Sequence, residues 1–281
     1  MAGFFGFFDY TKPGKGINKE DLDKSGIALY FDILWRRLGK IIAVNIFFLI
    51  ASIPAIVISL YLSPLIIMLL GSFSGVPIEA GAASVLRYYL TAAMLLLTGT
   101  GSASAAMSYV LRKYVNDTHA WVWSDFIDAL KENFLQGTLA YIINTVFFCV
   151  LSVALMYYGF YVKGTMSVFF TAVMIIIAVI FLMMQMYVYQ IMASVKLKLK
   201  DIYRNAALLT IGRLPVNIIA FAITALFLYG LNLILANPIV LAVVPLIFYS
   251  IITYTQIFIT NNTVNKYLIE PSEKQETQNK E

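Results

Sequence analysis

The chain has 281 residues, of which 60% are hydrophobic and only 12% are Asp, Glu, Lys or Arg. Soluble domains are nearer half apolar and a quarter charged, so this composition excludes a soluble enzyme, a disordered protein and a nucleic-acid binder with a basic surface. It indicates a chain solvated mainly by lipid. A single cysteine (Cys149) and a single histidine (His119) exclude a disulfide framework and a thiolate or imidazole metal cage. No metal and no cofactor is expected.

Residues 1–40 are predicted to form a cytoplasmic N-terminal segment. It opens with an aromatic patch, expected to pack on the bundle or the lipid headgroups, whose members are Phe4, Phe5, Phe7 and Phe8. Residues 25–40 follow as an amphipathic interfacial helix, with Trp35 suited to the headgroup level. Because the first long apolar run begins only at Ile41, we expect insertion through this first membrane helix without a cleaved signal peptide.

Six stretches within residues 41–268 are long and apolar enough to cross a bilayer core of about 30 Å, which needs about 20 helical residues. They are 41–62, 88–111, 139–160, 168–192, 214–235 and 239–259. None contains Asp, Glu or Lys, and each is apolar all round rather than on one face. The sequence therefore predicts an all-α membrane protein with a six-helix transmembrane domain, followed by a disordered cytoplasmic tail over residues 269–281.

The distribution of basic residues predicts the orientation. Of 20 Lys and Arg residues, 18 fall on the side of both termini, and only Arg87 and Lys163 fall on the other. The positive-inside rule places the side rich in Lys and Arg in the cytoplasm. We therefore expect a multi-pass protein with both termini inside, and the net charge of +5 is no signal of nucleic-acid binding.

Two further cytoplasmic segments, residues 124–134 and 195–206, also have the pattern of amphipathic helices. One interpretation is that they rest on anionic lipid, which basic helix faces favour. The other is that they form a docking surface for a cytoplasmic partner. The candidate docking residues are Phe126, Ile127, Leu130, Phe134, Leu199 and Ile202.

The three amphipathic segments each lead into a membrane helix that hairpins back, which suggests three parallel helical-hairpin repeats. Trp35 precedes Asn45 by ten residues and Phe134 precedes Asn144 by ten, whereas the third unit reaches Asn217 with a longer spacing. Chance similarity between apolar helices is the alternative explanation.

Polar groups within the predicted spans are amides and hydroxyls rather than carboxylates. The main candidates are Asn45, Asn144, Gln185 and Asn217. Such groups usually hold helices together, with hydrogen bonds of about 0.6 kcal/mol on average. The functional alternative is a path for a sugar or another small polar solute.

Small residues crowd the second span around Gly99 and Gly101. Their spacing favours close packing of helix backbones, either inside the bundle or in a dimer. The alternative is a helix broken at these glycines, with backbone exposed to a substrate.

Several blocks resemble the YesL-like family, bacterial membrane proteins that carry a domain of unknown function. They are residues 1–16, 34–38, 101–109, 125–134 (DFIDALKENF), 198–206 and 212–215. The resemblance implies location in a bacterial plasma membrane and association with binding-protein-dependent carbohydrate importers. It provides no catalytic residues.

We expect a non-catalytic subunit associated with the permease or ATPase of a carbohydrate ABC importer. A stand-alone transporter or channel is the alternative. Residues 205–215 faintly resemble the permease loop that contacts the ATPase, but the interval from Gly212 to Pro215 is too short and the acidic first residue is missing. A partner subunit is therefore favoured over a divergent permease.

Overall fold

The structure is a computed structural model that describes residues 26–74, 100–234 and 248–271, together with residues 83, 87, 90, 91 and 93–95. The predicted N-terminal aromatic patch and most of the predicted tail lie outside these ranges. Every regular element in the described part of the chain is a helix. The chain divides into two units, Met1–Arg36 and Arg37–Glu281.

Helix α2 (Gly26–Ala51) begins in the first unit, where Asp32 and Arg36 form an ion pair of 3.8 Å one turn apart. The prediction of a separate interfacial helix ending at residue 40 is wrong, because α2 continues unbroken through residues 40 and 41. The break falls instead at Ser52, where α2 and α3 (Ile53–Ser74) bend by 58°. Pro54 explains it, because a proline ring clashes with the carbonyl four residues earlier in a straight helix.

The predicted span 88–111 is not one helix in the described residues, because α5 (Ser102–Val115) begins only at Ser102. Gly101, just before it, has φ of +69°, a left-handed conformation that a continuous α-helix does not contain. The backbone N–H of Thr100 donates to Ser104 Oγ at 2.9 Å, which satisfies one donor near the start of the new helix. The expectation of an unbroken second span is therefore corrected.

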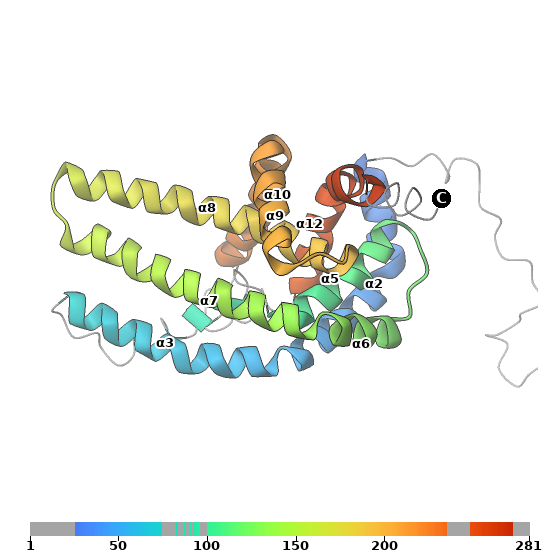
Figure 1. Cartoon of the computed structure of the whole chain (residues 1–281), viewed down its shortest axis with the longest axis horizontal. Coiled ribbons are helices and arrows are strands. Elements are labelled where there is room, and N and C mark those ends of the chain that lie inside the picture. Colours follow the sequence, from blue (N-terminus) through green and yellow to red (C-terminus); the bar gives the residue numbers. More distant parts are fainter. Residues whose placement is uncertain are drawn as a thin grey trace, which may run out of the picture. The chain divides into compact units, whose positions relative to one another are not determined.

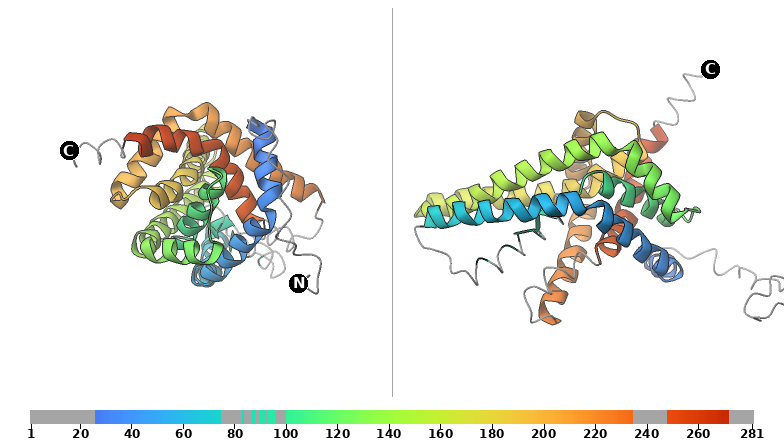
Figure 2. Two further views of the ribbon diagram at one scale, coloured as in Figure 1. Left: turned by 90° about the vertical axis from the view of Figure 1, so that its right-hand side faces the viewer. Right: turned by 90° about the horizontal axis from the view of Figure 1, so that it is seen from below.

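Helices α6 (Val122–Glu132) and α7 (Phe134–Met156) are separated by a single residue, Asn133. A short π-helical turn, Tyr157–Tyr161, then leads to α8 (Thr165–Ser194). The long apolar segments Phe134–Gly159 and Thr165–Ser194 are two candidate membrane spans, and they coincide with the predicted spans 139–160 and 168–192. Helices α3, α7 and α8 lie in one layer with α7 in the middle (Figures 1 and 2).

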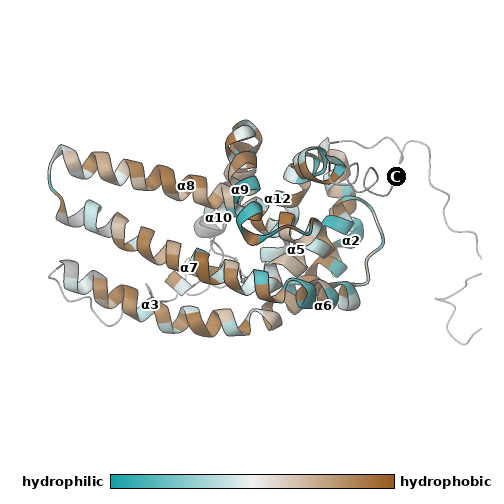
Figure 3. Cartoon of the chain, viewed as in Figure 1, coloured by the Kyte–Doolittle hydropathy of each residue, from teal (hydrophilic) through white to brown (hydrophobic). Residues whose placement is uncertain are grey.

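Helices α9 (Leu199–Gly212) and α10 (Leu214–Ile234) bend by 93° at Arg213. Helix α10 coincides with the predicted span 214–235, whereas the last predicted span is described only from the start of α12 (Tyr249–Val264). A π-helical turn, Asn265–Ile269, follows α12. The described residues thus hold two candidate spans, or up to four if each bent pair of helices counts as one. Brown, apolar residues dominate α3, α7 and α8, and teal, polar ones gather on α6 and α9 (Figure 3).

The second unit is built around α5, which contacts α6, α7, α8 and α12. Small side chains make this possible, because Ala103, Ala105 and Ala106 are all buried. At the start of α5, a Cβ atom on Gly101 would lie 2.7 Å from the carbonyl oxygen of Gly137 on α7. The small residues of this segment therefore pack closely against neighbouring helices, and the same segment also contains a helix break.

Two of the three predicted repeat units share an organisation in the structure. Both α6–α7 and α9–α10 consist of a short amphipathic helix, one non-helical residue and a long apolar helix. The first unit differs, because α2 is continuous from Trp35 through Asn45.

Candidate functional site

A cluster of polar side chains joins the C-terminal end of α5 to the ends of α8 and α12. The guanidinium group of Arg112 donates to Asn261 Oδ1 at 3.1 Å, and also to Ser194 and Asn265. Asn261 donates in turn to Asn116 Oδ1 at 2.6 Å. One cation therefore ties three helices together through charge-assisted hydrogen bonds, which are roughly twice as strong as neutral ones. We call this end of the bundle the polar end.

Arg37 holds α2 to the loop after α5 at the same end. Its guanidinium forms an ion pair with Asp117, donates to the carbonyl of Thr118 at 2.8 Å and lies 4.9 Å from the centre of the Tyr114 ring. Asp117 has a φ of 51°, which aspartate tolerates better than most residues. The largely buried side chain of Arg37 therefore holds this loop against α2.

Lys113 and Asp125 link α5 to α6 through an ion pair of 3.1 Å. Burial lowers the pKa of Lys113, but hydrogen bonds to Asp125 and Tyr109 outweigh it, so the pKa is raised overall and the ammonium stays charged. The carboxylate of Asp125 also accepts the backbone N–H of Trp121 at 2.9 Å. Trp121 is the N-cap residue of α6, so Asp125 accepts from the residue directly before the helix.

The structure divides the predicted docking residues between core and surface. Phe126 on α6 is 1% exposed, and its ring lies 6.2 Å from that of Phe47 on α2 in a tilted arrangement. Ile202 on α9 is fully buried, in a core cluster that it shares with residues of α5, α7 and α8. These two residues face other helices of the same chain, so their assignment to a docking surface is corrected. Ile127, Leu130 and Leu199 are half-buried, and Phe134 is exposed.

The outward face of α9 carries a different set of residues. Lys200, Arg204, Leu208 and Ile211 are all exposed and recur every three or four positions, which places them in one stripe. The opposite face of α9 is buried. The predicted amphipathic segment ended at residue 206 and therefore missed Leu208 and Ile211, although their helical spacing from Lys200 was a visible signal.

A groove of about 690 Å³ opens between the α6–α7 junction and the connection from α8 to α9. Three lysines and one glutamate are among its lining residues: Lys131, Lys196, Lys198 and Glu132. Lys196 and Glu132 form an ion pair of 3.1 Å, and Gln136 closes part of the wall by donating to the carbonyl of Leu197 at 3.0 Å.

Each predicted intramembrane amide makes a hydrogen bond to another helix. Asn144 and Gln185 form a reciprocal pair at 2.9 and 3.1 Å between α7 and α8, and Tyr203 of α9 donates to Asn144 Oδ1 at 2.7 Å. Asn45 accepts the backbone N–H of Ser250 at 3.0 Å, which satisfies a donor in the first turn of α12.

Asn217 stabilises the sharp bend between α9 and α10. Its amide donates to the carbonyls of Thr210 and Leu209 at 2.9 and 3.2 Å, and its oxygen accepts from Tyr187 of α8. It thereby gives the carbonyl of Thr210 a donor and adds a second donor to the carbonyl of Leu209, which also accepts the backbone N–H of Arg213 at 3.1 Å. The contacts of the four amides favour the packing interpretation over a solute path.

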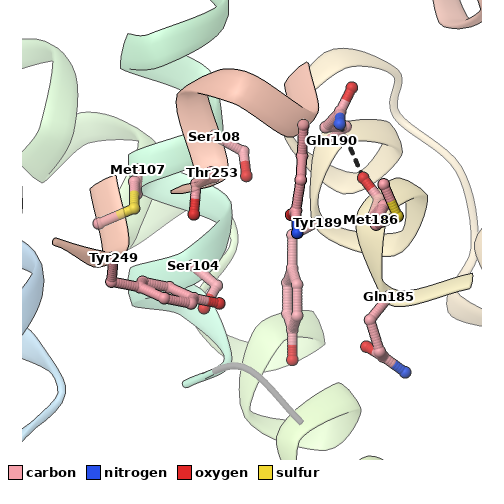
Figure 4. A pocket seen from close by; sticks show the side chains of 10 residues that line it. Ser104, Met107, Ser108, Gln185, Met186, Tyr189, Gln190, Tyr249 and Thr253 are labelled. Carbon is pink, nitrogen blue, oxygen red and sulfur yellow. Dashed lines mark hydrogen bonds between the residues drawn. The ribbon is translucent and has the colours of Figure 1, made fainter. Parts of the chain in front are cut away.

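A small polar cavity lies between α5, α8 and α12 (Figure 4). Tyr249 reaches across it towards Ser104, and Gln190 also contributes to the wall. Its volume of about 30 Å³ holds about two water molecules. Ligand sites are usually about 300–1,000 Å³, so this cavity does not accommodate a sugar in the described conformation.

Comparison with known proteins identifies one domain. Residues 41–155 match a family model described as protein of unknown function, DUF624. Neither the comparison with curated proteins nor the comparison with solved structures finds a match. The matched region runs from the middle of α2 to the end of α7, so it includes the Gly101 break and the contact of α5 with α7.

Proposed function

We propose that this chain, which carries a DUF624 domain over residues 41–155, is a non-catalytic integral membrane subunit that associates with a carbohydrate ABC importer. The resemblance to YesL-like proteins is the reason for proposing an importer as the partner. The outward face of α9 is the surface that we propose contacts it. We propose this surface in place of the predicted docking residues Phe126 and Ile202, which are buried.

The observation that carries the proposal is the placement of α9. Because α9 is bent by 93° from α10, it runs along the membrane surface if α10 crosses the bilayer. Leu208 and Ile211 are then displayed at 58% and 62% exposure beside Lys200 and Arg204. Two apolar anchors next to two cations suit a protein partner with an apolar patch rimmed by acidic groups, because interfaces combine an apolar centre with a polar rim.

Co-purification tests the proposal. We expect the chain, expressed at native level and extracted in mild detergent, to carry the permease or ATPase of an importer. The double variant Leu208→Asp with Ile211→Asp should lose most of that partner while remaining inserted. Trp121→Asp is the control, because it places a carboxylate at a position that is 70% exposed and lies outside α9. Recovery of the chain without any importer subunit would contradict the proposal.

A transporter remains the second candidate function because of the break at Gly101. Secondary transporters often use half-helices that end near the middle of the bilayer beside the substrate. Here Ser104, in the first turn of α5, lines the polar cavity. A solute path would require this cavity to open well beyond 30 Å³. Sugar flux into proteoliposomes containing only this chain would support this candidate, and no flux across a panel of sugars would remove it.

A further inference from the structure

We propose that the groove between the α6–α7 junction and the α8–α9 connection binds the headgroup of an anionic phospholipid. The groove stands at the ends of both candidate spans. One span begins at Phe134 and the other ends at Ser194, and residues on either side of these two points line the groove. The groove therefore lies at the boundary between apolar and polar parts of the chain, the level at which lipid phosphates are found.

The charge of the groove suits an anion. Its three lysines and one glutamate give a net charge of +2. Glu132 is paired with Lys196, which leaves Lys131 and Lys198 as the cations best placed to contact a phosphate. Basic pockets at the ends of membrane helices are recognised sites for anionic headgroups.

An apolar strip continues from the groove along α7. Leu135 lines the groove and is 75% exposed. The other exposed members of the strip follow at steps of three or four residues, which places them on one helix face. They are Leu139, Ile142, Val146 and Val150.

This continuity distinguishes a lipid from the other occupants of a basic groove. A phosphodiester in the groove would extend its acyl chains along the strip, where they would cover apolar surface. A free phosphate would contact the lysines but would leave the apolar residues of the strip uncovered. An acidic peptide from a soluble protein would have to follow the strip into the membrane.

Native mass spectrometry of the full chain in detergent tests the site, with phosphatidylglycerol as the anionic probe and phosphatidylcholine as the neutral one. We expect preferential retention of phosphatidylglycerol. The double variant Lys131→Gln with Lys198→Gln should raise its apparent Kd about thirtyfold, since each lysine near an anionic headgroup contributes a factor of about five. These substitutions leave the Lys196–Glu132 pair intact.

Removing the charge of Glu132 gives a second test, because it should strengthen lipid binding, whereas a damaged structure would weaken it. Glu132→Gln frees Lys196, so phosphatidylglycerol should bind about fivefold more tightly. The matched control is Lys40→Gln with Lys163→Gln, which removes two exposed lysines that do not line the groove and should change the Kd by less than about twofold.

Two further readouts separate the lipid from a soluble anion. Leu135→Asp should weaken phosphatidylglycerol binding, and excess inorganic phosphate should not displace the lipid. The proposal is overturned if phosphate competes fully, if phosphatidylcholine binds as tightly, or if the groove and control variants lose lipid equally. It is also overturned if the groove in native membranes is occupied by a peptide segment of another protein.

Discussion

Gly101 and Gly137 bring the backbones of α5 and α7 into direct contact. A Cβ atom on Gly101 would lie 2.7 Å from the carbonyl oxygen of Gly137, and Gly101 itself has φ of +69°. Glycine adopts this backbone conformation without steric cost and allows the neighbouring backbone to approach. The two glycines therefore determine where the interrupted helix resumes and against which neighbour it packs.

We expect Gly137→Ala to destabilise the folded chain, because the added methyl group would meet the backbone at Ser102. Overpacking of this kind costs about 1–3 kcal/mol. Gly212→Ala is the matched control, because nothing lies within 4 Å of a Cβ atom at Gly212. Thermal unfolding in detergent should show a lower midpoint for Gly137→Ala alone. Equal midpoints would mean that α5 and α7 do not meet at this point.

Arg112→Lys should also destabilise the chain, although it preserves the charge. A lysine ammonium cannot reproduce the planar fork that serves Asn261, Ser194 and Asn265 together. Loss of hydrogen bonds to a charged group costs about 1.5–3 kcal/mol. Arg204→Lys, on the exposed face of α9, is the control and should be neutral. Proteolysis of the polar end is the measurement, and similar resistance in both variants would refute the role of Arg112.

Phe126→Asp should disrupt the packing of α6 against α5 rather than block the binding of a partner protein. Phe126 is 1% exposed, so the new carboxylate would be buried in an apolar site, whereas Leu208→Asp places the same group on an exposed position. Replacement of a buried phenylalanine by a small residue already costs about 3–5 kcal/mol. We expect poor recovery of folded Phe126→Asp and normal recovery of Leu208→Asp by size-exclusion chromatography. Normal recovery of both would contradict the placement of Phe126.

The amide pair of Asn144 and Gln185 should show a small coupling energy. A double-mutant cycle with Asn144→Ala and Gln185→Ala should return about 0.6 kcal/mol and at most about 1.7 kcal/mol, as for other hydrogen bonds between membrane helices. Equilibrium unfolding in mixed micelles provides the four free energies. A coupling of zero would show that the amides are independent, and that outcome would favour a solute path over packing.

Hydropathy predicted the long apolar helices well, since α7, α8 and α10 lie within a few residues of their predicted spans. It did not predict the bends. Average hydropathy is insensitive to one proline or glycine, so the effects of Pro54 at Ser52 and of Gly101 in the second span do not alter it. The glycine run did signal that a break was one of two alternatives.

Amphipathicity correctly indicated that one face of α6 and one face of α9 are buried, but it does not identify what covers them. Phe126 and Ile202 are covered by the chain itself rather than by a partner. The polar end was harder to predict. Arg112 is 149 residues from Asn261 and 153 from Asn265, and only the packing of α5 against α12 brings it to them.

Photo-crosslinking in cells tests the proposed importer contact most directly. A benzoylphenylalanine in place of Ile211, which is 62% exposed on α9, should form an adduct with an importer subunit. The same group in place of Tyr229, which is 61% exposed on α10, is the matched control and should react with lipid alone. An adduct with the permease or ATPase at Ile211 but not at Tyr229 is the predicted result. Absence of any importer adduct at Ile211, in a chain that is folded and inserted, would contradict the account.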